Sequence, residues 1–244
     1  MPGFGTVINV AAVILGGLLG LLLGKRLQKR FQESMINAIG VCVLFIGIAG
    51  AMEQMLIIRD GVLNSSKTMM LIGSMAIGTL VGELLDLEGA LERFGNWLKR
   101  ITKSEGDDGF VEAFVTASLT ICIGAMAVVG SIQDSLLGDY SILMAKAVLD
   151  LLIIMMMAAS KGKGVVFSAV PVAILQGSIT ALAFLLEPIF TETALSYMSL
   201  VGSVLIFCVG LNLIREKKVK VANMLPALVI AVLWAILFAH SDGV

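Results

Sequence analysis

Eight apolar segments, each about long enough to cross a bilayer, constrain the fold of this chain more than any other feature. An α-helix rises about 1.5 Å per residue, so about twenty apolar residues span the ~30 Å hydrocarbon core of a membrane. Apolar windows of this kind occur at residues 4–24, 37–58, 69–86, 110–130, 141–160, 165–187, 196–214 and 223–240. They predict an all-α fold, a polytopic membrane helix bundle of about eight transmembrane helices in which residues 1–244 form a single transmembrane domain.

The basic residues of the loops give an independent test of this number, because Lys and Arg accumulate in the cytoplasmic loops of membrane proteins. Fourteen of the seventeen Lys and Arg residues lie in the connections after the first, third, fifth and seventh segments. Only Arg59 and Lys67 lie in the other connections, and Lys146 lies inside a segment. This distribution predicts that the odd-numbered connections are cytoplasmic and that both termini are outside.

Composition excludes the soluble classes of protein. The chain is 58% hydrophobic and 14% charged, with a mean hydropathy of +1.00, whereas soluble domains carry roughly a quarter charged residues. We therefore expect the lipid bilayer as a partner and no nucleic acid. Cys42, Cys122 and Cys208 lie in three different apolar segments without the spacing of a metal site, and we interpret them as packing residues.

Signatures of catalysis are missing from the sequence. There is no HExxH motif, no Ser/His/Asp set and no Gly-rich phosphate loop followed by lysine. The single histidine, His240, lies in the C-terminal tail, which argues against a histidine-based metal or proton site. We expect no enzyme activity, no catalytic residue, no cofactor and no bound metal.

Segments 110–130 and 141–160 form a hairpin that carries polar residues into the membrane interior. Asp150 lies near the bilayer midplane, where an ionised side chain costs from ~2.5 to more than ~10 kcal/mol, and Lys146, four residues earlier on the same helical face, supplies the opposite charge. Gly124 and Gly130 precede further polar residues and predict an irregular helix between these two glycines. The predicted pathway for an ion or solute comprises Asp150, Lys146, Thr116, Ser118, Thr120, Gln133, Asp134 and Gln176, with Glu53, Glu83, Glu112, Asn9 and Asn212 as secondary candidates.

Glycines recur at four-residue spacing, as Gly16, Gly20 and Gly24 in the first segment and as Gly78 and Gly82 in the third. Such ridges of small residues let helix backbones approach closely. They predict tight helix packing, and we also expect a homo-oligomer through glycine-rich helix faces.

Residues 87–103 carry apolar side chains at helical spacing opposite charged ones. This pattern predicts an amphipathic helix that lies on the inner membrane surface as an anchor.

The two ends of the chain show weak internal similarity. VINVAAVILGGLLGLLLG and INAIGVCVLFIGIAGAM resemble FSAVPVAILQGSITALAFLL and MSLVGSVLIFCVGLNLI, with Gly40 aligned to Gly202. Segments 1 to 3 begin outside and segments 6 to 8 begin inside, so the two halves form a predicted inverted repeat around the central polar hairpin. Transporters commonly place a substrate site between such repeats, although apolar segments also resemble one another by chance.

Several stretches together carry a family resemblance over nearly the whole chain. They are GTVINV at 5–10, GELL at 82–85, FVEAFVTASLTICIGAMAVVGSIQD at 110–134, GDYSILMAKAVLD at 138–150 and VANMLPAL at 221–228. These stretches resemble a family of uncharacterised bacterial multi-pass inner-membrane proteins, the YqgA-like and YdfK-like proteins. The resemblance implies a bacterial cytoplasmic-membrane location, and it supplies no catalytic or binding residue.

Two functions fit these patterns. The first is a transporter or channel for an ion or small polar solute that uses polar groups of segments 4 to 6, because a carboxylate at midplane depth can bind a cation or exchange a proton. The alternative is a structural or partner-binding membrane protein without transport activity, in which the glycine ridges mediate assembly. Lys146 and Asp150 also have a purely structural interpretation, as an ion pair that only fixes helix packing.

Overall fold

The computed structural model describes residues 3–24, 28–59, 61–104, 106–123, 125–186, 189, 191–215 and 219–238, and it is almost entirely helical. The first half contains α1 (Phe4–Gly24), α2 (Lys29–Met55), a hairpin of β1 (Leu56–Arg59) and β2 (Val62–Ser65), α3 (Thr68–Leu85) and α4 (Leu87–Ile101). The second half contains α5 (Phe110–Cys122), α6 (Ala125–Leu136), α7 (Ser141–Lys161), the 3-10 helix η1 (Lys163–Ser168), α8 (Ala169–Ala181), α9 (Ala183–Leu186), α10 (Glu192–Ile214), α11 (Val221–Met224) and α12 (Pro226–Phe238).

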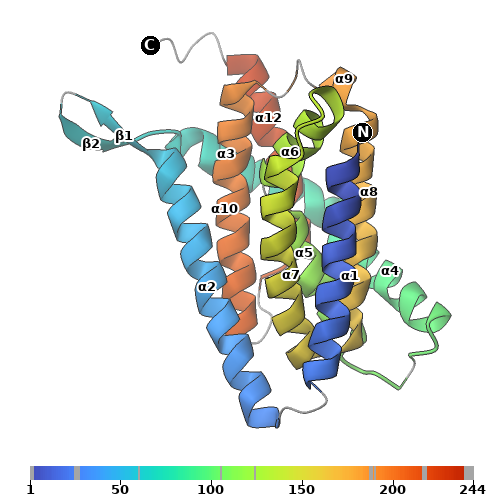
Figure 1. Ribbon diagram of the computed structural model, residues 1–244. Helices are drawn as coiled ribbons and strands as arrows, with labels where there is room; N and C mark the ends of the chain where they lie inside the picture. Colours follow the sequence, from blue (N-terminus) through green and yellow to red (C-terminus); the bar gives the residue numbers. More distant parts are fainter. Residues whose placement is uncertain are drawn as a thin grey trace.

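The predicted polytopic bundle is confirmed. Among the described residues, seven helical stretches are long and apolar enough to cross a membrane, and the bent pair α5 and α6 brings the number to eight. The long helices run side by side, and α1 begins at the end of the bundle at which α12 finishes, at the top of Figure 1. An even number of crossings requires this arrangement.

The glycine ridge of α1 packs directly on the backbone of α7. A methyl group added at Gly16, Gly20 or Gly24 would collide with main-chain oxygens of α7, those of Leu151, Met155 and Ala159. The two helices therefore run in the same direction at the close separation that only glycine permits.

The other glycine-rich faces are also occupied within the chain. Gly40 of α2 lies against Leu213 of α10 and Gly50 lies against Ser203, so these two helices are antiparallel. Gly78 of α3 packs on Ala227 of α12. These glycine-rich faces are occupied by other helices of the same chain. The homo-oligomer through such faces therefore stays a prediction.

The β-hairpin corrects one predicted boundary. Residues 56–58 were expected at the end of the second segment, but the helix stops at Met55 and they form β1, which pairs antiparallel with β2. The hairpin projects from the carboxyl end of α2 (Figure 1). Gly61, with φ of 75°, provides the positive backbone angle that its turn needs.

Helix α4 covers most of the predicted amphipathic stretch 87–103 and packs beside α5 and α11. Gly95 lies against Phe114, and Glu88 accepts a hydrogen bond from the backbone N–H of Ala222 at 3.1 Å. Its first turn is capped by Asp86, whose carboxylate accepts from the N–H of Gly89 at 3.2 Å. Arg93, 2.9 Å from Asp86, holds the pKa of that carboxyl below its usual range.

Candidate functional site

The fourth span is broken where the sequence predicts irregularity. Helix α5 ends at Cys122, Ile123 is extended (φ −80°, ψ 121°), and α6 resumes at Ala125. The two helices are bent by 61°. Gly124 lies outside the described residues, whereas Gly130 lies within α6, so the irregularity falls at the start of the predicted interval and does not extend through it.

Lys146 and Asp150 of α7 form a buried ion pair beside this break. The Lys146 Nζ donates to both carboxylate oxygens of Asp150, at 2.9 and 2.7 Å, and the two residues are 8% and 3% exposed. A third hydrogen bond of 2.7 Å runs from Nζ to the main-chain oxygen of Ile121. An uninterrupted helix would satisfy that oxygen from the N–H four residues later. The lysine therefore both neutralises Asp150 and caps the carboxyl end of α5.

A layer of hydrogen bonds joins α1, α6 and α8 near the end of the bundle at which α1 begins. The N–H of Gly5 donates to Asp134 Oδ2 at 2.9 Å, and the hydroxyls of Thr6 and Thr180 lie 3.3 Å apart. Ser135 donates to the main-chain oxygen of Thr180 at 2.9 Å. We call these five residues the terminal polar layer.

The next turn toward the middle of the bundle contains polar side chains without hydrogen-bond partners. Asn9, Ser131 and Gln176 each lie one turn, about 5.4 Å, from a member of the terminal polar layer on the same face of its helix. All three are at most 1% exposed. The side-chain polar atoms of all three, and Oδ1 of Asp134, make no hydrogen bond in the described structure.

Lys146 and Asp150 lie on the face of α7 that contacts α1 and α6. The Leu143 side chain of α7 lies against both Gly5 of α1 and Gly130 of α6, and Lys146 follows one turn later on that face. The Asn9 amide lies near the Asp150 carboxylate, outside hydrogen-bonding geometry. We call the following set the polar cluster: Asn9, the main-chain oxygen of Ile121, Ser131, Asp134, Lys146, Asp150 and Gln176.

The structure separates the predicted site residues into two groups. Asp150, Lys146, Asp134, Gln176 and the secondary candidate Asn9 enter the polar cluster. The hydroxyls of Ser118 and Thr120 instead bond within α5, to the main-chain oxygens of Phe114 and Thr116. The other candidates lie outside the cluster. Thr116 and Gln133 are half-buried, and Glu53 is exposed. Glu83 pairs with Lys220, Glu112 pairs with Lys161, and Asn212 is hydrogen-bonded to the backbone of Val219.

Several of the groups that build this region were not predicted from the sequence, among them Thr6, the main-chain oxygen of Ile121 and Ser131. Thr6 and the main-chain oxygen of Ile121 have no chemical signature in the sequence, and their roles depend on contacts between distant helices. Ser131 had a usable signal, because it lies three residues before Asp134 and therefore on the same helical face.

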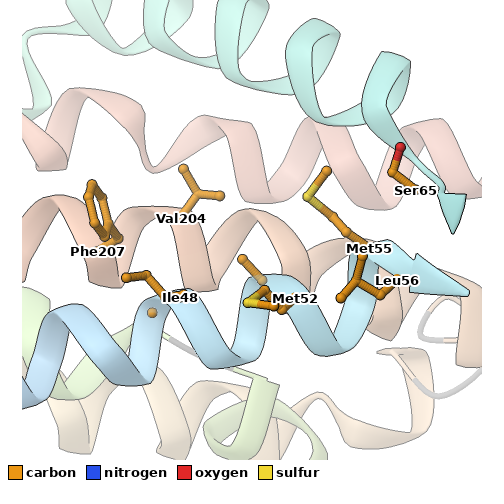
Figure 2. Close-up of a pocket in the computed structure, with 9 residues that line it drawn as sticks. Ile48, Met52, Met55, Leu56, Ser65, Val204 and Phe207 are labelled. Atoms are coloured by element: carbon orange, nitrogen blue, oxygen red, sulfur yellow. The ribbon is translucent and has the colours of Figure 1, made fainter. Parts of the chain in front are cut away.

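Two observations bear on bound ligands. Among the described residues, no group of three or more His, Cys, Asp or Glu is arranged to hold a metal ion. A cavity of about 250 Å³ lies between the carboxyl-terminal half of α2, the hairpin and α10, lined by Ile48, Met52, Phe207 and other mainly apolar residues (Figure 2). Asp150 does not line this cavity, and the lining is too apolar to bind an ion.

The broken span, the buried charges and the long apolar helices define the class, a multi-pass membrane protein with a polar interior. The chain belongs to the family described as "Protein of unknown function (DUF554)", whose model matches residues 4–236. It is 30% identical over 227 residues to "Uncharacterized membrane protein YdfK" of Bacillus subtilis (strain 168), and the aligned region covers 93% of each chain. It is 32% identical over 231 residues to "Uncharacterized protein YqgA" of Escherichia coli (strain K12), which covers 93% of this chain and 94% of that protein. No solved structure matches this chain.

Proposed function

We propose that the protein transports an ion or a small polar solute through the polar cluster. The observation that carries the proposal is the conjunction of a buried ion pair with unpartnered polar side chains beside a break in a membrane-spanning helix. Charged residues within membrane spans are costly, and in many membrane proteins they mark ion or substrate pathways. Broken spans supply main-chain oxygens to such sites in many transporters.

The unpartnered groups favour a binding role over a packing role. A buried donor or acceptor without a partner costs about 1–3 kcal/mol. Asn9, Ser131 and Gln176 together therefore carry a penalty that apolar residues of similar size would not. A ligand that forms these hydrogen bonds would recover this free energy on binding.

Lys146 provides a mechanism for exchange. Its ammonium group already fills the place of a cation between Asp150 and the main-chain oxygen of Ile121. The side chain is long and flexible, so a competing ligand can displace it without moving the backbone. We propose that substrate binding and release are coupled to making and breaking this ion pair.

The membrane setting is part of the proposal. The distribution of Lys and Arg supports both termini outside and the odd-numbered connections in the cytoplasm, and the family resemblance supports the bacterial inner membrane. The proposed inverted repeat is supported by contacts between predicted counterparts, α2 with α10 and α3 with α12.

Flux measurements on purified protein in liposomes test the transport proposal. A panel of ions and small metabolites is screened with the wild type, Asp150→Asn and the control Asp139→Asn, whose carboxyl is exposed in the loop before α7. Flux that is retained in Asp139→Asn and lost in a folded Asp150→Asn variant supports transport. Full flux in Asp150→Asn would show that this carboxylate is not part of the pathway.

The structural alternative has its own support, since all three donors of Lys146 are satisfied within the chain. If the pair only fixes packing, the double variant Lys146→Met, Asp150→Asn should recover both stability and any flux. A double variant that is stable but inactive favours the transport role.

A further inference from the structure

The charges buried in the polar cluster do not balance. Its two carboxyl groups, those of Asp134 and Asp150, are 0% and 3% exposed. Lys146 is the only buried basic residue in the described part of the chain, and its Nζ is bonded to Asp150. No described Lys or Arg pairs with Asp134. The cluster therefore has room for one further positive charge.

The free oxygen of Asp134 is one of four buried side-chain oxygens of the polar cluster that lack hydrogen-bond partners. They come from three helices and are Oδ1 of Asn9, Oγ of Ser131, Oδ1 of Asp134 and Oε1 of Gln176. Each of the four residues is at most 1% exposed. Hard cations prefer such sets of carboxylate, amide and hydroxyl oxygens, and no nitrogen or sulfur ligand is needed.

We propose that Asn9, Ser131, Asp134 and Gln176 form a binding site for one monovalent alkali cation. A single uncompensated carboxylate matches one positive charge, whereas a divalent cation would leave an excess of positive charge in a buried place. The N–H of Gly5 on the other oxygen of Asp134 holds the carboxylate so that Oδ1 stays free to coordinate.

The site also explains how cation binding would influence the neighbouring ion pair. Gly5, whose N–H binds Asp134, and Asn9, which lies near Asp150, are about one turn apart on α1. A cation at this distance repels the Lys146 ammonium and competes for Asp150. The inference rests on the proposed function, because it assigns the coupling ion to the proposed transport site.

Thermal unfolding of the full chain in detergent measures the binding. The unfolding midpoint is recorded while NaCl, KCl or LiCl replaces choline chloride at constant ionic strength. A ligand that binds only the folded state raises the midpoint in a saturable way, so we expect a saturable rise of several degrees for at least one alkali cation. An identical midpoint in choline and in all three alkali salts would overturn the inference.

Variants locate the site. Asp134→Asn keeps an acceptor for the N–H of Gly5 but loses the charge, and we expect the cation-dependent rise to disappear, while it persists in the exposed control Asp139→Asn. Ser131→Ala removes one hydroxyl and should weaken the apparent affinity about tenfold, which corresponds to about 1.4 kcal/mol. If Asp134→Asn does not fold, Ser131→Ala decides the matter, because an unchanged affinity there would contradict the assignment.

Two further outcomes separate this inference from others. Stabilisation by lowering the pH, with no effect of alkali cations at any pH, would identify a proton site and overturn the cation assignment. Flux without alkali dependence would refute the cation site but leave the proposed transport standing, whereas alkali binding without flux of any solute would refute transport and support the site.

Discussion

Replacing Lys146 by methionine should destabilise the protein more than most single substitutions, because it removes three hydrogen bonds at once. Methionine fills a similar volume, so little packing is lost. The substitution leaves Asp150 without a counter-charge and the main-chain oxygen of Ile121 without a donor. Lys146 is the only buried basic residue in the described part of the chain, so no other buried cation there can replace its ammonium group.

The size of the effect follows from the burial of the pair. Removing one partner of a buried ion pair costs about 3–5 kcal/mol, and for a chain of this length about 1 kcal/mol corresponds to roughly 2–4 °C in the unfolding midpoint. We therefore expect Lys146→Met to unfold on the order of 10 °C below the wild type. Asp150→Asn should lose less, because the amide oxygen still accepts one hydrogen bond from Lys146.

A double-mutant cycle isolates the interaction. Unfolding midpoints of the wild type, the two single variants and the double variant Lys146→Met, Asp150→Asn are measured in the same detergent. The double variant should be more stable than the sum of the two single effects predicts, by at least about 2 kcal/mol. Additive effects, or a Lys146→Met variant within about 1 °C of the wild type, would refute the view that this pair is buried and mutually dependent.

Three other features give separate predictions. Gly20→Leu should cost at least about 1–3 kcal/mol in stability or prevent folding, because its side chain meets the α7 backbone, whereas Gly177→Ala, which faces open space, should change the unfolding midpoint little. Thr191→Ala should cost about 1 kcal/mol, measured by thermal unfolding, because Thr191 Oγ1 accepts from the N–H of Ala194 at 3.2 Å and caps α10. In a variant without native cysteines, Ser65→Cys should react with an impermeant thiol reagent added to the exterior of intact cells, and Glu33→Cys should react only after lysis; the reverse pattern would invert the proposed topology.

The membrane helices were predictable because a bilayer imposes both a length and a composition on every span. The first predicted segment, residues 4–24, coincides with α1, and the fifth differs from α7 by a single residue. The hairpin was missed because Ile57 and Ile58 are as apolar as the helix before them. The Asp60–Gly61 pair that follows is a common hairpin turn and carried the relevant signal.

The site was predictable only where its residues are neighbours along one helix. Lys146 and Asp150 are four residues apart, so helix geometry alone brings them together. The approach of Asn9 to Asp150, or of Gly5 to Asp134, joins residues more than a hundred positions apart. Those contacts depend on which helices pack together, and apolar periodicity does not encode that choice.

The close packing of α1 on α7 has a consequence for the synthesis of the protein in the cell. At ~5–20 residues per second, α7 leaves the ribosome on the order of ten seconds after α1. During this interval the glycine ridge of α1 lacks the helix on which it packs. The partners of α2 and α3, which are α10 and α12, are synthesised later than α7. The early helices must therefore remain in the membrane as independent spans, held by their apolar length alone, until the late helices arrive.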